Sequence, residues 1–360
     1  MSENSFLRRR WKLLLNILTV ALLVVLAYAI RHQLSQTIDN LARVHAWALA
    51  LILPIELLNY HAQTKLYQTL FRTTGTNLTY KSLFKMSVEL NFVNHVFPSA
   101  GVSGISYFGL RMKSAEQVSA GKATLVQVMK LILVFFSFEV ILLAGVVFLA
   151  IGGKANNLTM LVAGSLSTFM VLGTVGFAYV AGSQERIHSF MTGMTTFLNR
   201  LIHKVRPKHP ETINVERVRF LFEEMHQNYM LFKEHLADLK APFWYAVLAN
   251  ATEVMAIYVV YIAFGEWVNV GAVILAYAVA NFAGVLSVLP GGVGVYEALM
   301  TAVLVAAGVP AALSLPVTIM YRVLNTILQV PPGYVLYHRS LMARQDKVQQ
   351  PPTGEPEHHG

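Results

Sequence analysis

Two stretches place proline and glycine inside otherwise apolar sequence, where they could expose backbone to a ligand. The first, FPSAGVSG, contains Pro98, Ser99, Gly101, Ser103 and Gly104. The second, LPGGVGVYE, contains Pro290, Gly291, Gly292, Gly294 and Glu297. A half-helix that begins after such a break has N–H groups without intrahelical acceptors at the positive end of its dipole. Each break is therefore a candidate site for an anion such as phosphate, with an ordinary helix kink as the alternative.

Ionisable side chains recur at matching distances from the two breaks. Lys130 follows Pro98, and Arg322 follows Pro290, by the same 32 residues (130 − 98 and 322 − 290). An arginine can hold a phosphate in a fork and a lysine holds it as a point charge. Since Glu56 and Glu253 precede the respective breaks, each half of the chain repeats the order carboxylate, break, cation.

Polar residues also follow helical spacing in four segments, so that each segment would present one polar stripe. The stripes are Glu56, Asn59 and Gln63; Gln127, Lys130 and Ser137; Asn250 and Glu253; and Arg322, Asn325 and Gln329. They predict a hydrophilic cavity shared by four helices. The alternative is a set of neutral pairs, Arg322 with Glu297 or Glu253 and Lys130 with Glu56 or Glu139.

The composition places these residues in a membrane protein. The chain of 360 residues is 55% hydrophobic and only 13% charged, and it contains no cysteine, which excludes disulfides and thiolate metal sites. Its net charge of +9 is expected from Lys and Arg in cytoplasmic loops rather than from nucleic-acid binding. We find no metal-ligand spacing, cofactor motif or catalytic motif, so the sequence predicts neither an enzyme nor a cofactor.

The apolar segments predict an all-α polytopic protein with about six transmembrane helices and two re-entrant helical hairpins. The expected spans are Leu13 to Ile30, Ala46 to Tyr60, Ala123 to Ile151, Leu158 to Ala181, Phe243 to Phe264 and Leu313 to Tyr337. The hairpins, about 83–110 and 270–307, contain the two breaks; non-helical backbone at membrane depth needs protein or water to shield it. The positive-inside rule predicts that both termini lie in the cytoplasm. The expected location of the protein is the plasma membrane.

The halves, 1–182 and 242–338, would then be inverted repeats, with a substrate site near the midplane as in many transporters. The polar region 183–241 would be a cytoplasmic loop with an amphipathic helix, on the membrane or packed on the spans. The polar, proline-rich tail 339–360 is expected to be disordered.

The motifs PGGVGVYE, MYRVLNTILQVPPGY and FPSAGVSG resemble the transmembrane flippase domain of lysylphosphatidylglycerol synthases, the multiple peptide resistance factor family. The resemblance covers about Leu13 to Tyr337, in a stand-alone form without the synthase domain. It implies translocation of an aminoacylated phospholipid and carries site roles to Pro290, Gly291, Gly292, Gly294, Glu297, Tyr321 and Arg322. The first hairpin reads SAGVSGISYF, without the Arg and Glu that several relatives have there.

The sequence thus predicts a lipid flippase whose partner is a membrane phospholipid, and the resemblance suggests aminoacylated phosphatidylglycerol as that lipid. Its predicted site comprises Glu56, Pro98, Ser99, Gly101, Ser103, Gly104, Lys130, Glu253, Pro290, Gly291, Gly292, Gly294, Glu297, Tyr321, Arg322 and Asn325. The alternatives are a polyprenyl-phosphate or glycolipid carrier and a non-transporting scaffold for a cytoplasmic lipid-modifying or glycosyl-transferring enzyme. A homo-oligomer is also considered.

Overall fold

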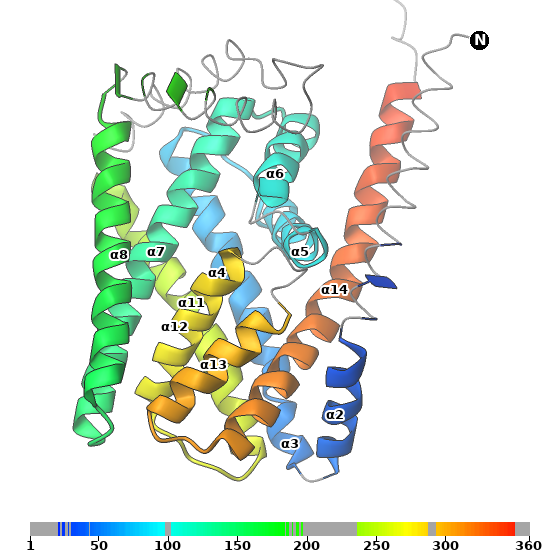
Figure 1. Cartoon of the computed structure of the whole chain (residues 1–360). Helices are drawn as coiled ribbons and strands as arrows, with labels where there is room; N and C mark the ends of the chain where they lie inside the picture. Colours follow the sequence, from blue (N-terminus) through cyan, green and yellow to red (C-terminus); the bar gives the residue numbers. More distant parts are fainter. Residues whose placement is uncertain are drawn as a thin grey trace, which may run out of the picture.

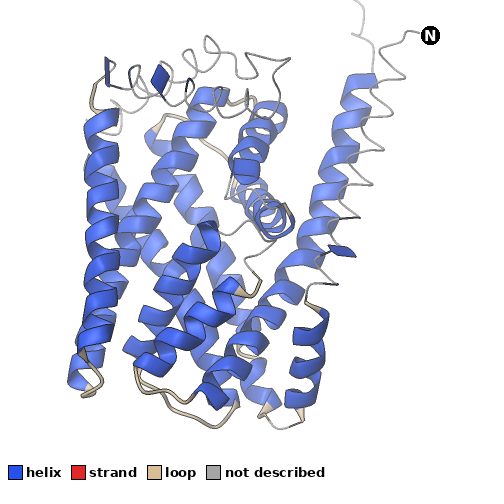
Figure 2. Ribbon diagram, in the orientation of Figure 1, coloured by secondary structure: helices blue, strands red, loops and turns tan. Residues whose placement is uncertain are grey.

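In the part of the chain that the structure describes, all regular secondary structure is helical and there is no strand (Figure 2). The computed structural model describes residues 30–42, 44–97, 102–183, 236–286 and 293–349, with isolated positions between 21 and 28 and between 185 and 196. Most of the predicted first span and the predicted amphipathic helix of the loop lie outside the described residues. The prediction of an all-α membrane protein is therefore confirmed for the described part.

The helices follow the chain order shown in Figure 1. They are α2 (Arg31–Leu41), α3 (Ala46–Leu49), α4 (Ile52–Thr73), α5 (Tyr80–Val96), α6 (Val102–Ala115), α7 (Ala120–Ile151), α8 (Asn157–Ala181), the short 3₁₀ helix η1 (Leu236–Leu239), α11 (Lys240–Ala263), α12 (Val270–Leu286), α13 (Val295–Ala306) and α14 (Ala311–Gln349). Side-chain caps fix two of the starts: Thr79 accepts from the Ser82 N–H and Ser119 from the Lys122 N–H, both at 3.3 Å.

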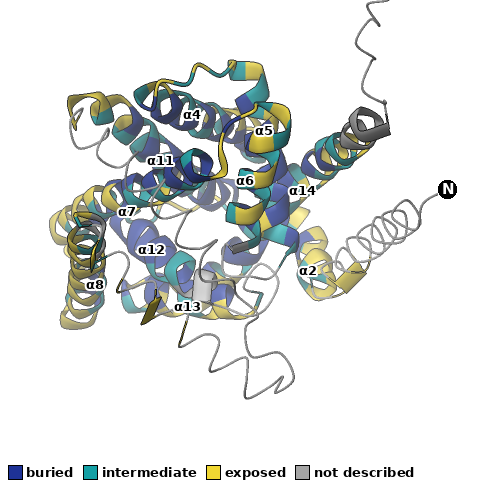
Figure 3. Cartoon of the chain, turned by 90° about the horizontal axis from the view of Figure 1, so that it is seen from above, coloured by how far each residue is buried: buried dark blue, intermediate teal, exposed yellow. Residues whose placement is uncertain are grey.

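Within the described residues, four helical stretches are long and apolar enough to cross a bilayer: Ala120–Ile151, Asn157–Gly176, Leu236–Ala263 and Ala311–Met342. They coincide with four of the six predicted spans. Shorter apolar helices, Val270–Phe282 and Val295–Ala306, come from the second predicted hairpin. The outer face of α8 carries exposed apolar side chains, including Leu161 at 67% and Leu172 at 65%, as a lipid-facing helix would (Figure 3).

Two predicted boundaries differ from the structure. The expected span Ala46 to Tyr60 is broken after α3, and its main helix α4 continues to Thr73. The apolar run ends at Tyr60, but the helix continues because polar residues such as Gln63 and Lys65 are also good helix formers. Likewise, α14 extends to Gln349, so 339–349 of the predicted disordered tail are helical; this stretch, SLMARQDKVQ after Arg339, is again rich in helix formers.

The connections between helices gather at two opposite ends of α7. At its start, the Lys122 ammonium donates to the Thr74 carbonyl and the Thr76 hydroxyl, both at 3.1 Å, so the α4–α5 connection lies there. At its end, Asn269 donates to the Phe148 carbonyl at 2.9 Å, and Asn156 donates to the Ala306 carbonyl at 2.7 Å. The α5–α6 pair therefore begins and ends at one end of the bundle, and the α12–α13 pair at the other (Figure 1).

Helices of the two halves pack against one another in reciprocal pairs. The α4 helix packs against α11, α5 packs against α14, and α7 packs against α12. Suppose that α4, α5 and α7 of the first half correspond to α11, α12 and α14 of the second half. The contact between α5 and α14 then corresponds to the contact between α12 and α7, and the contact between α4 and α11 corresponds to itself. The buried residues, dark blue in Figure 3, collect where these helices meet. Glu56, Asn250 and Gln329 are among the buried polar residues of α4, α11 and α14.

Candidate functional site

A chain of polar side chains follows one face of α14 and ends on carboxylates of two other helices. Tyr321 donates its hydroxyl hydrogen to Glu253 of α11 at 2.7 Å. Asn325 lies 3.4 Å from the Tyr321 hydroxyl and accepts from Gln329 at 2.5 Å. Gln329 also donates to Glu56 of α4 at 2.9 Å. The predicted stripe on α14 thus joins both halves of the molecule.

The polar residues of α4 also take part in this network. The Asn59 amide donates to Glu253 at 3.3 Å and to the Thr252 hydroxyl at 2.9 Å. Its carbonyl oxygen accepts from Gln63, one turn further along α4, at 2.6 Å. Three of the four predicted stripes therefore meet in one buried hydrogen-bond network. Buried polar groups require such partners, since a polar atom without one costs about 1–3 kcal/mol.

The two carboxylates of this network have neutral partners. Glu56, 8% exposed, accepts from Gln329, and Glu253 accepts from Tyr321 and Asn59. Among the residues with described positions, neither forms a salt bridge with a lysine, arginine or histidine. A charge at the centre of a bilayer costs about 2.5–3.5 kcal/mol on insertion scales. An uncompensated pair of carboxylates is thus suited to hold a cationic group or protons.

Next to this network, Arg322 forms an ion pair with Glu297. The guanidinium Nη1 and the carboxylate Oε1 are 2.7 Å apart, and the side chains are 14% and 6% exposed. The Tyr296 ring lies below the guanidinium, 4.7 Å from its Cζ. Of the two partners that the sequence left open for Arg322, the structure selects Glu297 rather than Glu253.

Glu297 also caps its own helix. Its second oxygen accepts from the Gly294 N–H at 2.6 Å, at the N-terminus of α13, and Gln33 of α2 donates to the first oxygen at 3.0 Å. Gly294 has φ +88°, a conformation that glycine adopts without the strain of a side chain. The expected anion site at this helix N-terminus thus already holds a carboxylate of the protein itself.

Other predicted site residues lie apart from this network. The Lys130 ammonium lies 4.8 Å from the centre of the Tyr67 ring. No described carboxylate pairs with it, so the alternative in which Lys130 pairs with Glu56 or Glu139 is not what the structure has. The cation–π contact with Tyr67 supplies a different partner. The α7 stripe makes its own contacts: Ser137 accepts from Asn250 at 2.7 Å, and Gln127 accepts from Tyr67 at 2.6 Å.

The predicted residues of the first break are only partly described. Ser103 lies 3.5 Å from the Phe97 carbonyl. A Cβ on Gly104 would lie 2.1 Å from the Asn94 amide oxygen, so this glycine allows α6 to approach α5 closely. Pro98, Ser99, Gly101, Pro290, Gly291 and Gly292 lie outside the described residues.

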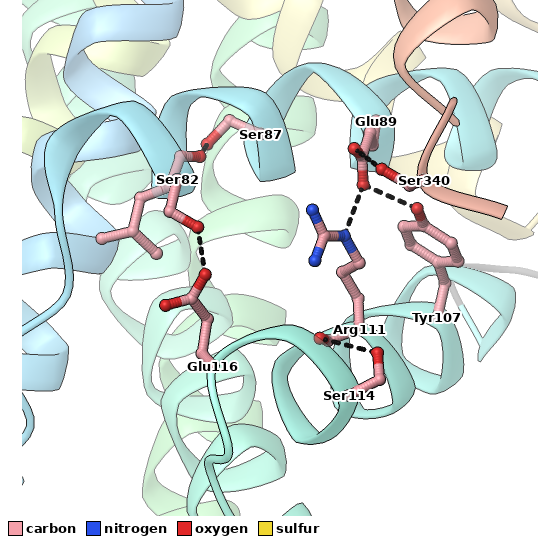
Figure 4. Close-up of polar contacts among 9 residues, drawn as sticks. Ser82, Ser87, Glu89, Tyr107, Arg111, Ser114, Glu116 and Ser340 are labelled. Carbon is pink, nitrogen blue, oxygen red and sulfur yellow. Dashed lines mark hydrogen bonds and ion pairs between the residues drawn. The ribbon is translucent and has the colours of Figure 1, made fainter. Parts of the chain in front are cut away.

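A second buried ion pair was not predicted from the sequence. Glu89 of α5, 1% exposed, pairs with Arg111 Nε of α6 at 3.1 Å and accepts from the Tyr107 hydroxyl at 2.7 Å (Figure 4). Its other oxygen accepts from Ser340 of α14. The signal was present, because a carboxylate inside the apolar stretch 83–110 needs a partner at membrane depth. Gln33 was also missed, since nothing in sequence links it to Glu297.

These helices and their buried polar network define a multi-pass helical membrane protein. The chain belongs to the family described as the lysylphosphatidylglycerol synthase TM region, whose model matches residues 13–333. A UPF0104 membrane protein of Methanothermobacter thermautotrophicus is 28% identical over 130 residues, 34% of this chain and 38% of that protein. A UPF0104 membrane protein of Methanocaldococcus jannaschii is 20% identical over 75% of this chain and 77% of that protein. The match to the first spans well under two thirds of its length.

Proposed function

We propose that the protein moves a phospholipid between the leaflets of the plasma membrane. The observation that supports this proposal is the polar network along α14. In it, Glu56 and Glu253, which have no cationic partner among the described residues, lie near the Arg322–Glu297 pair. This pairing of charges suits a headgroup that has both an amine and a phosphate, as an aminoacylated phosphatidylglycerol does. The amine would bind the carboxylates, and the phosphate would bind Arg322 in place of Glu297.

The exchange at Arg322 follows from what Glu297 contacts. Its carboxylate accepts from a guanidinium, an amide and a backbone N–H, which are the donor types that bind phosphate. An entering phosphate would take over the Arg322 contact, while Glu297 keeps its cap on Gly294. The lipid tails would stay in the hydrocarbon and the headgroup would pass between the hairpins, which open at opposite ends of the bundle. Discontinuous helices of inverted repeats form the substrate sites of many transporters in this way.

The energy source would be the headgroup gradient or the membrane potential, which contributes about 2.3 kcal/mol per charge for each 100 mV. With a negative interior the potential favours outward movement of an anionic headgroup and opposes that of a cationic one. The charge of the headgroup would therefore determine the direction in which the potential acts.

Reconstitution into liposomes tests the activity itself. Tail-labelled fluorescent phosphatidylglycerol, lysyl-phosphatidylglycerol and phosphatidylethanolamine are placed in both leaflets, and a membrane-impermeant reductant bleaches the outer leaflet. We expect at least one headgroup to exchange faster with the protein than in empty liposomes, so that bleaching proceeds beyond the outer half. If every headgroup stops at half bleaching, with and without an imposed potential, the transport proposal is refuted.

A further inference from the structure

Glu89, Tyr107, Arg111 and Ser340 form one polar cluster, in which only part of the Arg111 guanidinium makes a hydrogen bond. Glu89 accepts from Tyr107, Arg111 and Ser340, so both of its carboxylate oxygens have partners. Arg111 contributes only its Nε to this arrangement. Its two terminal nitrogens have no hydrogen-bond partner among the described residues, and Figure 4 shows them turned away from Glu89.

This arrangement leaves the end of the guanidinium ready for a second anion. Arginine binds phosphate most specifically through two parallel N–H···O bonds, and the two terminal nitrogens provide one such fork. The side chain is 16% exposed, so one side of it can be reached from outside the bundle. Arg322 differs, because its Nη1 already binds Glu297 at 2.7 Å.

The surroundings of Arg111 suit a lipid headgroup. The neighbouring Leu110 is 60% exposed, which provides apolar surface for lipid tails beside the guanidinium. Between them, α5 and α6 contain the cations Lys81, Lys85, Arg111 and Lys113 and the single carboxylate Glu89. Glu116, just past α6, accepts from Ser82.

We propose that Arg111 is a phosphate-binding site at the mouth of the first hairpin, which takes the phosphate through its two terminal nitrogens while Nε stays on Glu89. The positive-inside rule puts this mouth on the cytoplasmic side, so the site would receive headgroups from the inner leaflet. The inference rests on the proposed function for the lipid as ligand. A phosphate group is the shared chemistry of two sources, a phospholipid and the free anion.

Binding to the purified full chain in detergent tests this site without transport. Dioctanoyl phosphatidylglycerol, dioctanoylglycerol and inorganic phosphate are titrated by thermophoresis against the wild type, Arg111→Gln and the control Lys113→Gln. We expect Arg111→Gln to weaken phosphatidylglycerol binding roughly tenfold or more, since two charge-assisted hydrogen bonds are lost. Lys113→Gln, an exposed change of equal charge on the same helix, removes no hydrogen bond to the phosphate and should weaken binding far less than Arg111→Gln.

A second variant guards against misfolding, because Arg111→Gln leaves Glu89 without its cation. Glu89→Gln with Arg111→Gln removes both charges, and its elution and thermal midpoint show whether it is folded. Loss of phosphatidylglycerol binding in the folded double variant, with dioctanoylglycerol binding unchanged, supports the site. Equal phosphatidylglycerol binding in the wild type and the double variant, or an equal fall for dioctanoylglycerol, overturns it.

The titration with inorganic phosphate shows whether the site binds a phospholipid or the free anion. Arg111-dependent binding of inorganic phosphate as tight as that of the lipid assigns the site to the free anion, and much tighter lipid binding assigns it to the headgroup. Transport can fail while Arg111-dependent binding persists, and binding can fail while transport persists. Failure of this site and failure of the proposed function are therefore separate results.

Discussion

Two residues, Glu297 and Arg322, hold the centre of the proposed site together. Their side chains are 6% and 14% exposed, and the ion pair is supported by Gln33 and by the Gly294 N–H. Removing one partner of a buried pair leaves an uncompensated charge, whereas removing both leaves a neutral site. Each partner is therefore needed for stability while the other is present, and the pair is also the place of the proposed exchange with phosphate.

The stability contribution can be measured by a double-mutant cycle. We predict that Glu297→Gln and Arg322→Gln each destabilise the protein by about 3–5 kcal/mol, and that the double variant recovers most of this loss. Thermal unfolding in detergent, followed by intrinsic fluorescence, provides the midpoints. Additive losses in the double variant would contradict a direct pair.

Gly294 allows a separate test of backbone strain. Its φ of +88° is unfavourable for alanine, and a Cβ there would meet no atom within 4 Å, so only the backbone contributes. We predict that Gly294→Ala destabilises by about 1–2 kcal/mol. Gly164→Ala, in the interior of α8 with equally open space, should instead stabilise by about 0.5–1 kcal/mol. A similar midpoint shift for both variants would show that conformation is not the cause.

From the sequence, the polar residues of this site could be predicted, but which of them pair with one another could not. Spacing identified Arg322, Asn325 and Gln329 as one stripe, because helical geometry is local. It left Arg322 between two carboxylates, since pairing depends on how α13 and α14 pack. Gln33, which lies 264 residues from Glu297 in the chain, has no local signal at all.

At the scale of helices, small residues set how closely the two halves meet. A Cβ on Gly271 of α12 would lie 2.1 Å from the Gly145 carbonyl oxygen and 2.8 Å from the Leu149 nitrogen of α7. On the reciprocal pair, a Cβ on Gly333 of α14 would lie 2.9 Å from the Val88 carbonyl oxygen of α5. Small residues allow such close approach of helices in membranes.

This close contact predicts a strong effect of one methyl group. Gly271→Ala meets backbone on α7, which cannot move aside as a side chain can, so we expect a loss of about 1–3 kcal/mol. Gly176→Ala, on α8 with no atom within 4 Å, provides the control and should not destabilise. Equal unfolding midpoints for the two variants would contradict the close packing of α7 on α12.

The sequence predicted most helices but not where each one ends. Hydropathy identified the apolar part of α14, which ends near Tyr337, whereas the helix continues to Gln349. A helix ends where its hydrogen bonding and caps end, and an apolar window does not record this. The same reason explains why α4 continues past Tyr60.

At the scale of the whole molecule, the α5–α6 pair begins and ends near the start of α7, and the α12–α13 pair begins and ends near its other end. In the membrane, these ends should face opposite compartments. Because the sequence contains no cysteine, single cysteines can report which compartment each end faces.

We predict that Asn77→Cys, in the α4–α5 connection, is labelled by an impermeant maleimide only after the cells are opened. Ala155→Cys and Glu266→Cys, in the connections at the other end of α7, should be labelled in intact cells, and all three positions are exposed. Labelling of Asn77→Cys and Ala155→Cys from the same side would refute the proposed inverted arrangement.

The exchange rate of a transported phospholipid, in liposomes that contain variants of the α14 network, shows most directly whether this network carries the lipid. The variants are Arg322→Gln with Glu297→Gln, and Glu56→Gln with Glu253→Gln; Lys154→Gln, in the exposed α7–α8 connection, is the control. We predict that each network variant slows exchange about tenfold or more while remaining folded, because contacts to the headgroup are lost, and that the control matches the wild type. Wild-type exchange in both folded network variants would show that the α14 network does not carry the lipid.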